Sequence, residues 1–515
     1  MRLFLTSVLL AGLFLPCAAA AAPANGTAPA QTAVVRTAPP QVTGRAPDQT
    51  MPEIAERKLD NGIPVYIAVR KKVPLAHVIL VFKGAGSKND PAGKYGLADF
   101  AVSCMDEGAG DKDALAFAEA VDLLGASISA DAGWDTAAVS ASCMSERLPE
   151  TLDLFADLVM SPAFPQKELD RLKKEALDGF VNARVSPGSL NSVAFNRFVF
   201  GEDSRYGTLR AGTPQQVASF TRDDVVGYYT KNFDPQNAFI CVGGDVDPEA
   251  VTQLLNKRLG KWSVCHCGEG EDGSRTAAKP VPAPKYEERY IPADMPGRVP
   301  MADRIIIVDR PGAQQAVIRV GCLGVTVKDP DRLAIQAMNT LLGGSFASRL
   351  NDNLRERNGY TYGASSGFDF RLDRGAFAAS TSVQTDKVIP AVREMLKEID
   401  RMHQPVPKDE LQRTLNYMAY AFPSGFEAGG SVTALMTKLI GYDYPKDYVD
   451  TYVSNVLKLT PEEIKKAADR TLDVKQMKVI IVGDAKALEP QLKEAGWRAQ
   501  VLTMDEVMGP KMTAE

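Results

Sequence analysis

Strand-like patterns of apolar and polar residues recur in two long segments of the chain. The first segment opens with such a pattern at residues 62–67, and the second opens with one at residues 304–308. Alternation at residues 137–141 and 376–380 is typical of paired strands in hairpins. In both segments, the patterns predict a strand, a helix, a pair of strands, a long helix, further helices and a closing strand.

The two segments also repeat each other in sequence. Residues 164–171, FPQKELDR, return as residues 406–413, VPKDELQR. Residues 221–225, TRDDV, return as residues 460–464, TPEEI. The second pair combines a Thr cap with acidic residues in the first turn, which predicts two helix starts. The chain is therefore expected to contain one body plan twice.

These patterns predict an α+β fold of two homologous domains, each an antiparallel or mixed sheet covered by helices on one face. We expect an N-terminal domain at residues 53–265 and a C-terminal domain at residues 301–505. Residues 266–300 are rich in Gly, Pro and charged residues. This composition predicts a linker between the domains.

The first residues have the composition of a secretory signal peptide. Arg2 precedes an apolar run and an alanine-rich end, and the run is too short to span a bilayer stably. We therefore expect a signal peptide at residues 1–22, a disordered leader at residues 23–52, and a periplasmic protein. Pro16 stands where a lipoprotein signal carries a small residue, which favours ordinary cleavage over lipidation at Cys17.

The charge and composition of the chain argue against two classes of partner. The formal net charge is −5, and no basic tract is present, which argues against nucleic acid. Hydrophobic residues make up 45% of the chain, but no later apolar run is long enough to cross a membrane. Six cysteines would remain after cleavage, and some of them could pair in an exported protein.

Histidine is too scarce for an ordinary catalytic zinc site. The 515 residues contain three histidines, His77, His266 and His403. No two of them are four residues apart, whereas a catalytic zinc ion normally takes three protein ligands. The cluster at residues 265–267, Cys-His-Cys, lacks a second ligand pair, which favours a loop or an adventitious site over a structural zinc site.

Residues 96–108, GLADFAVSCMDEG, resemble the zinc-binding helix of the pitrilysin/insulinase metallopeptidases, peptidase family M16. In active members, this helix reads H-x-x-E-H, with two zinc-binding histidines and a glutamate that activates water. The matching positions here are Asp99, Val102 and Ser103, and the family's third ligand position falls on Gly179. The resemblance therefore implies a family member that holds no zinc.

A second candidate set lies in a predicted helix–turn–strand segment of the C-terminal domain. Phe346, Leu350 and Leu354 recur every four residues and predict an amphipathic helix. Gly359 is expected to end this helix, because glycine readily adopts a left-handed conformation. Alternation through Phe368 then predicts a strand that begins at once.

Arg355 at the helix end and Tyr362 in the strand are expected to converge across this turn. A guanidinium and a phenol can together hold a peptide carbonyl or stabilise its oxyanion. The two residues match an Arg and Tyr pair, seven residues apart, that pitrilysin-type enzymes carry in the domain facing the zinc site. A framework role is also open, since an arginine at a helix C-terminus satisfies the helix dipole and a tyrosine often opens a strand.

Gly343 and Gly344 precede this helix. They resemble a short form of the glycine-rich loop in the non-catalytic subunit of mitochondrial processing peptidase, which implies a substrate-binding role. The simpler interpretation is a helix terminator, with Ser345 capping the next helix.

The resemblance implies a non-catalytic, substrate-binding subunit of a heteromeric bacterial zinc metallopeptidase, inactive alone. A homologous partner with H-x-x-E-H would supply the zinc, this chain would supply Arg355 and Tyr362, and both would bind an extended peptide. The alternative is a periplasmic peptide-binding or scaffold protein without a role in proteolysis. Neither function requires a cofactor in this chain.

Overall fold

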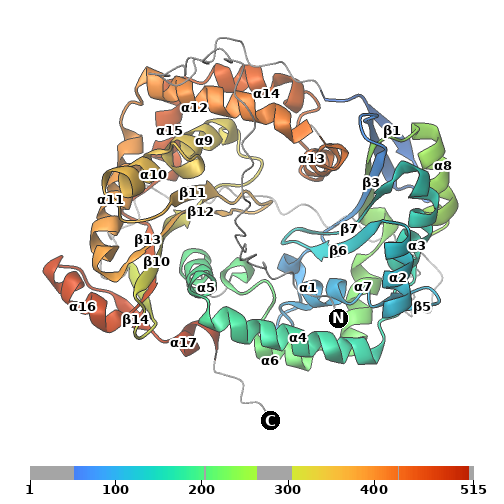
Figure 1. The fold of residues 1–515 in the computed structure, drawn as a ribbon, viewed down its shortest axis with the longest axis horizontal. Helices are drawn as coiled ribbons and strands as arrows, with labels where there is room; N and C mark the ends of the chain where they lie inside the picture. The colour runs from blue at the N-terminus through green and yellow to red at the C-terminus, as the bar shows by residue number, and fades with distance from the viewer. Residues whose placement is uncertain (1–50, 202–203, 264–303, 427, 510–515) are drawn as a thin grey trace, which may run out of the picture. The chain divides into compact units, whose positions relative to one another are not determined.

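The computed structural model describes residues 51–201, 204–263, 304–426 and 428–509 (Figure 1). We call residues 51–263 the N-terminal half and residues 304–509 the C-terminal half. The predicted signal peptide, almost all of the predicted leader and the predicted linker fall outside the described residues, as does the cluster at residues 265–267. These expectations therefore stay predictions.

The N-terminal half contains a six-stranded sheet, a two-stranded ribbon and the helices that pack around them. Its strands are β1 (Ile54–Lys58), β2 (Pro64–Val69), β3 (Leu75–Lys83), β4 (Gly108–Ala109), β5 (Lys112–Asp113), β6 (Ser127–Ala132), β7 (Thr136–Met144) and β8 (Ala238–Gly244). Its α-helices are α1 (Leu97–Ser103), α2 (Ala114–Leu123), α3 (Leu148–Met160), α4 (Gln166–Val185), α5 (Pro187–Phe200), α6 (Pro214–Ser219), α7 (Arg222–Asn232) and α8 (Pro248–Leu259).

The C-terminal half contains a second six-stranded sheet. Its strands are β9 (Ile305–Asp309), β10 (Gln315–Leu323), β11 (Ala364–Phe368), β12 (Ala376–Gln384), β13 (Lys478–Gly483) and β14 (Gln500–Leu502). Its helices are α9 (Arg332–Asn339), a π-helical turn (Thr340–Gly344), α10 (Arg349–Asn351), a second π-helical turn (Asp352–Arg357), α11 (Val388–Asp400), α12 (Lys408–Ala421), α13 (Gly429–Gly441), α14 (Tyr448–Leu457), α15 (Pro461–Thr471), α16 (Ala485–Glu494) and α17 (Met504–Met508).

The two sheets have the same strand order. The first runs β1-β2-β8-β3-β7-β6, and the second runs β14-β9-β13-β10-β12-β11. The sheets differ in the outermost strand, since β1 is antiparallel to β2 whereas β14 is parallel to β9. The α+β class with two homologous units is therefore confirmed, although a different part of the chain completes each sheet.

The repeated helix starts are built as the sequence predicts. In α7, the Thr221 hydroxyl accepts the backbone N–H of Asp224, and the Asp224 carboxylate accepts the N–H of Thr221. In α15, Thr460 and Glu463 form the same reciprocal pair. Each pair satisfies two backbone donors that a helix start leaves open.

Each sheet has its own hydrophobic core on one face. In the N-terminal half, that core includes residues of β2, β3, β7 and α3, among them Ile67, Phe82 and Phe155. In the C-terminal half, it includes residues of β10, β12 and α11, among them Ile318 and Phe377. The alternation of β-strand side chains leaves a second face on each sheet that this core does not cover.

Helix α5 of the N-terminal half covers part of the second face in the C-terminal half (Figure 1). Leu190 and Phe195 pack there against Ile480. The Asn191 side-chain amide donates hydrogen bonds of 3.0 Å to the carbonyls of Val317 and Ile480. The sequence prediction placed helices on one face only, so this contact between the halves was not foreseen.

Helix α13 of the C-terminal half makes the reciprocal contact. Val432 and Met436 are buried against the second face of the N-terminal sheet, beside Phe239 and Cys241. A Cβ on Gly243 would lie 2.2 Å from the Thr433 hydroxyl, so the glycine allows the helix to approach the strand closely. Each half therefore supplies one helix to the sheet of the other.

The described residues bear on two questions raised by the composition, namely disulfide pairing and membrane-spanning segments. Among the described residues, Cys104, Cys143, Cys241 and Cys322 are thiols without a disulfide partner. Burial raises the pKa of the Cys241 thiol to about 12, so it stays protonated at neutral pH. Within the described residues, every helix is too short or too polar to cross a bilayer.

We predict that Gly321→Ala weakens the seat of α5 on the C-terminal sheet. A Cβ on Gly321 would lie 2.0 Å from the Phe377 carbonyl oxygen and 2.8 Å from the Phe195 ring, so backbone and helix must both move. We expect a loss of about 1–3 kcal/mol in the free energy of unfolding, measured by chemical denaturation.

The matched control is Gly227→Ala. Gly227 lies inside α7, and a Cβ there would meet no heavy atom within 4 Å. This change should stabilise the protein by about 0.5–1 kcal/mol, the helix preference of alanine over glycine. Equal effects of the two substitutions would contradict the packing argument.

Candidate functional site

Asp90 fixes the start of α1, the helix that carries Asp99, Val102 and Ser103. Its carboxylate accepts the backbone N–H groups of Gly96 and Ala98 at 2.8 and 2.9 Å. The Arg205 guanidinium donates to the same carboxylate at 2.9 Å. Burial raises the pKa of Asp90, although Arg205 and the two amides oppose the rise. The helix that carries the candidate site is therefore held by a buried ion pair.

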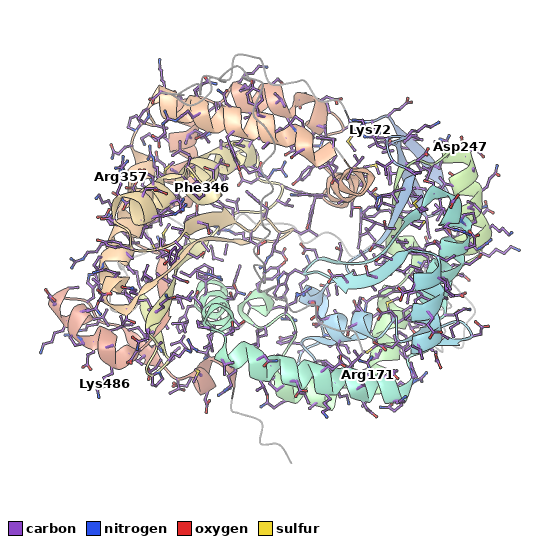
Figure 2. The ribbon with its side chains drawn as sticks, in the orientation of Figure 1. Lys72, Arg171, Asp247, Phe346, Arg357 and Lys486 are labelled. Atoms are coloured by element: carbon purple, nitrogen blue, oxygen red, sulfur yellow. The ribbon has the colours of Figure 1, made fainter. Side chains whose placement is uncertain are left out.

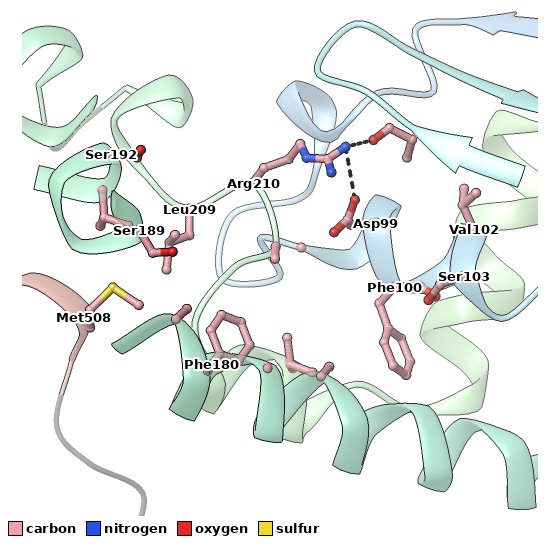
Figure 3. A pocket seen from close by; sticks show the side chains of 18 of the residues that line it. Asp99, Phe100, Val102, Ser103, Phe180, Ser189, Ser192, Leu209, Arg210 and Met508 are labelled. Atoms are coloured by element: carbon pink, nitrogen blue, oxygen red, sulfur yellow. Dashed lines mark hydrogen bonds and ion pairs between the residues drawn. The ribbon is translucent and has the colours of Figure 1, made fainter. Parts of the chain in front are cut away.

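Asp99 forms an ion pair in place of a metal bond (Figure 3). Its carboxylate lies 3.2 Å from Nη1 of Arg210, which also donates to the Ala132 carbonyl of β6. Burial raises the pKa of Asp99, while the charge of Arg210 lowers it and that of Asp131 raises it further. The carboxylate of Asp99 is thus already paired with the guanidinium of Arg210.

The other two positions of the helix also carry no free ligand. Val102 is 2% exposed and belongs to the core of the N-terminal half. The Ser103 hydroxyl donates to the Phe100 carbonyl at 2.8 Å, within its own helix. The chemistry of a general base and of a histidine ligand is therefore absent from α1.

The fold nevertheless brings the four predicted positions together. Asp99, Val102, Ser103 and Gly179 line one cavity of about 1100 Å³. Gly179, on which the third ligand position falls in the sequence, lies in α4 and has no side chain that could bind a metal. Within the described part of the chain, no group of three or more His, Cys, Asp or Glu side chains could hold a metal ion. The residues present do not fit a zinc ion.

Apart from the charged residues Asp131 and Arg210, the rest of this cavity has apolar and hydroxyl side chains (Figure 3). Phe180 from α4 and Met508 from α17 face it, as do Ser189 and Ser192 from α5. Arg210 was not among the predicted site residues, because it lies in a loop far along the chain from α1. A signal was present in the aspartate itself, since a half-buried carboxylate on a mostly apolar helix favours a nearby cation or hydrogen-bond donors.

Arg355 lies in the second π-helical turn, and its guanidinium lies over the Phe346 ring at 4.5 Å. Its Nε is 3.6 Å from a carboxylate oxygen of Glu356. Figure 2 shows where Phe346 lies in the C-terminal half. Phe346 is 73% exposed, whereas Leu350 and Leu354 are fully buried. The predicted apolar stripe was therefore wrong at Phe346, because α10 begins only at Arg349 and the preceding residues are not helical.

Tyr362 is 96% exposed and lies before β11, not in it. The expectation that a strand begins directly after Gly359 was wrong. Thr361 interrupts it, because its hydroxyl accepts the N–H of Gly363 at 3.1 Å and donates to the Gly363 carbonyl at 2.9 Å, which forms a local bend. Arg355 and Tyr362 still line one pocket, of about 860 Å³, which we call the Arg355/Tyr362 pocket.

Gly343 and Gly344 end the first π-helical turn. A Cβ on Gly343 would lie 2.5 Å from the backbone nitrogen of Ser366 in β11, so the packing of that strand requires the glycine. The helix does end here, but Ser345 is not the cap of the next helix, since α10 starts after Ser348. A substrate-binding role for the two glycines stays a prediction.

Two family models match the chain. The model described as "Insulinase (Peptidase family M16)" matches residues 66–187. The model described as "Peptidase M16 inactive domain" matches residues 219–418. The two matches together span more than half of the chain, and the chain belongs to peptidase family M16.

Relatives of this chain carry both kinds of description. An uncharacterized zinc protease of Rickettsia bellii is 24% identical over 357 residues, which cover 69% of this chain and 80% of that protein. The non-peptidase homolog YmxG of Helicobacter pylori is 21% identical over 434 residues, which cover 82% of this chain and 92% of that protein. Relatives of similar identity to this chain thus carry both a zinc protease name and a non-peptidase name.

Solved structures support the fold. A crystal structure described as the peptidase M16 inactive domain from Pseudomonas fluorescens matches with a TM-score of 0.72 and 23% identity, over 84% of this chain and 98% of that one. A protease from Helicobacter pylori matches with a TM-score of 0.73 and 19% identity, over 84% of this chain and 100% of that one. Together with the replaced ligands on α1, the family match is consistent with a non-catalytic, peptidase-like protein.

We predict that a zinc site can be built only when the three ligand positions, 99, 103 and 179, change together. The substitutions Asp99→His, Val102→Glu and Ser103→His rebuild the helix motif, and Gly179→Glu adds the third ligand from α4. Because a catalytic zinc ion needs three protein ligands, the fourfold variant should retain one zinc per chain after dialysis, measured by metal analysis.

Two controls define this test. The threefold variant without Gly179→Glu should retain less than one zinc per chain, and Gly179→Glu alone should retain none. Equal zinc content in the threefold and fourfold variants would show that α4 does not face the α1 positions as described.

Proposed function

We propose that this protein is the substrate-binding, non-catalytic subunit of a heteromeric zinc metallopeptidase. The observation that carries the proposal is the contrast between two sites of one chain. The zinc-helix positions are occupied by an ion pair and a buried valine. In the Arg355/Tyr362 pocket, in contrast, the tyrosine is almost wholly exposed.

Exposure of Tyr362 supports a role outside the folded chain. Tyrosine is amphipathic, and a ring that is 96% exposed contributes little to the stability of its own protein. Phe346 lies nearby in sequence and is also mostly exposed, with the Arg355 guanidinium over its ring. Aromatic and arginine side chains dominate binding energies at protein surfaces.

In the proposed complex, this chain holds and polarises the peptide. The Tyr362 hydroxyl donates a hydrogen bond to the carbonyl oxygen of the bond to be cleaved. The Arg355 guanidinium stabilises the negative charge that develops on that oxygen. The H-x-x-E-H motif of a homologous partner provides the metal and the base, and this chain contributes no metal ligand.

Export to a periplasm is part of the proposal. Its support is the N-terminal composition, with a positive charge, a short apolar run and an alanine-rich end. A peptidase subunit in that compartment would meet extended or unfolded peptides.

The first test is co-purification from the cells that produce the protein. We expect a homologous chain with an H-x-x-E-H motif, about one zinc per heterodimer, and peptidase activity that neither chain shows alone. An unrelated assembly, or a complex without zinc, would contradict the proposal and support a scaffold role.

The second test changes the two site residues in the active complex. Arg355→Ala and Tyr362→Phe should each lower kcat by about 100-fold to 1000-fold, the loss that follows removal of one oxyanion donor. The matched control is Arg357→Ala, since Arg357 lies in the same turn, pairs with Asp352 and does not line the pocket. Full turnover in both site variants would sink the catalytic part of the proposal.

A further inference from the structure

The wall of the Arg355/Tyr362 pocket includes an arginine for which the proposed chemistry has no use. Arg319 lies in the middle of β10 and lines the pocket together with the side chains of β11 and β12. Its strand neighbours Ile318 and Val320 point into the core of the C-terminal half, so Arg319 points to the opposite face.

Arg319 opens a row of polar side chains that runs across three strands. The register pairs Arg319 of β10 with Ser380 of β12, and Ser380 with Ser365 of β11. All three residues line the pocket. Paired residues on one face of a sheet lie about 5 Å apart at Cβ, so the row carries a guanidinium and two hydroxyls in sequence toward the outermost strand.

Arg319 has no carboxylate partner among the described residues. Its guanidinium lies over the Phe195 ring of α5 at 5.4 Å, and no acidic group of the described chain lies within 4 Å of it. Burial lowers the pKa of Arg319, and no neighbouring charge opposes this. A half-buried cation without a counter-charge costs free energy in the folded protein.

The other two cations of the pocket each have a carboxylate beside them. Arg355 lies 3.6 Å from Glu356, and Lys387 lies 2.9 Å from Asp386. Glu356 is the only carboxylate that lines the pocket in the described part of the chain. The uncompensated positive charge of the pocket therefore belongs to Arg319.

The fold does not require an arginine at this position. The closing strands β8 and β13 can be aligned at their last residues, Gly244 and Gly483. Cys241 of β8, which pairs with Ile79 of β3, then corresponds to Ile480 of β13, which pairs with Arg319 of β10. Ile79 is therefore the counterpart of Arg319. Ile79 packs against α13 among apolar side chains. A hydrophobic residue therefore suffices at this position in the N-terminal sheet. The requirements of the fold do not explain why the C-terminal sheet has an arginine there.

We propose that Arg319 binds a carboxylate of the peptide, so that the pocket selects peptides with an acidic side chain close to the bond held by Arg355 and Tyr362. This inference rests on the proposed function for the position of the peptide. The guanidinium fork matches a carboxylate in two parallel hydrogen bonds. Its face is held by Phe195, so its edge is left for the ligand.

Binding to the isolated full chain tests this selectivity without the partner. The probes are fluorescent heptapeptides of alanine with Glu, Gln or Lys at the central position, acetylated and amidated, and followed by fluorescence anisotropy. A fourth probe has the central Gln and a free C-terminal carboxylate. We expect the Glu peptide to bind about 10–100 times more tightly than the Gln peptide, as for a hydrogen bond to a charged group.

Three variants identify the side chain responsible. Arg319→Gln should remove the preference for Glu, and Arg319→Glu should reverse it in favour of the Lys peptide. Arg319→Ile copies the counterpart Ile79, so it should fold with an unchanged thermal midpoint and show no preference. Lys387→Gln, in the same pocket, should keep the preference for Glu.

The outcomes distinguish a side-chain carboxylate from a C-terminal carboxylate. They also distinguish failure of the Arg319 inference from failure of the proposed function. Tight binding of the free-acid Gln probe, but not of the internal Glu probe, overturns the side-chain assignment in favour of a C-terminal carboxylate. Equal binding of Glu and Gln peptides, or binding of neither, overturns the inference. In the complex, Arg319→Gln should lower the ratio of kcat/KM for the Glu peptide over that for the Gln peptide, whereas Arg355→Ala should lower kcat with both peptides alike, so the two proposals fail separately.

Discussion

The reciprocal exchange of one helix between the two halves is the contact on which the rest of the structure depends. Helix α5 covers part of the second face of the C-terminal sheet, and α13 packs on the second face of the N-terminal sheet. A sheet with one uncovered apolar face would expose that face to water, so each half needs the helix of the other. The exchange also determines which part of the C-terminal sheet is left uncovered. The Arg355/Tyr362 pocket borders α5 at Arg319 of β10, whose guanidinium lies over Phe195 of α5.

The two similar halves have different sites because different residues occupy corresponding parts of one body plan. In the N-terminal half, the segment that holds α1 is fixed by Asp90 and Arg205, and its cavity is closed to metal chemistry by the Asp99 pair. In the C-terminal half, a helix broken by two π-helical turns leads to the exposed Tyr362. One body plan therefore carries a replaced site and the Arg355/Tyr362 pocket.

Local patterns predicted the parts of the fold that depend on local physics. The capped starts of α7 and α15 and the paired strands around β7 and β12 follow from residues within one turn or one hairpin. The exchange of α5 and α13 could not be predicted in this way, because each helix packs against strands far away in the sequence. Phe346 was misplaced for a related reason: its spacing fits a helix, but the helix starts after it.

For the same physical reasons, some residues of the candidate site could be predicted from the sequence and others could not. The motif on α1 and its gap at Gly179 could be found because they compare position by position with a known pattern. Arg210 and Arg319 belong to no motif, and their meaning appears only when the fold places one beside Asp99 and the other beside a row of serines. A charge on a sheet face can be judged only against what surrounds it.

The pair of Asp99 and Arg210 also limits the evolutionary routes open to this chain. A histidine at position 99 alone would leave Arg210 beside a metal-binding ring and without its carboxylate. A glutamate at position 102 alone would add a negative charge near Asp99 and Asp131, inside a hydrophobic core. Each single step toward the H-x-x-E-H motif is therefore unfavourable before the other steps are taken. A zinc site on α1 requires several substitutions together, so the pair of Asp99 and Arg210 acts as a barrier to metal chemistry in this half.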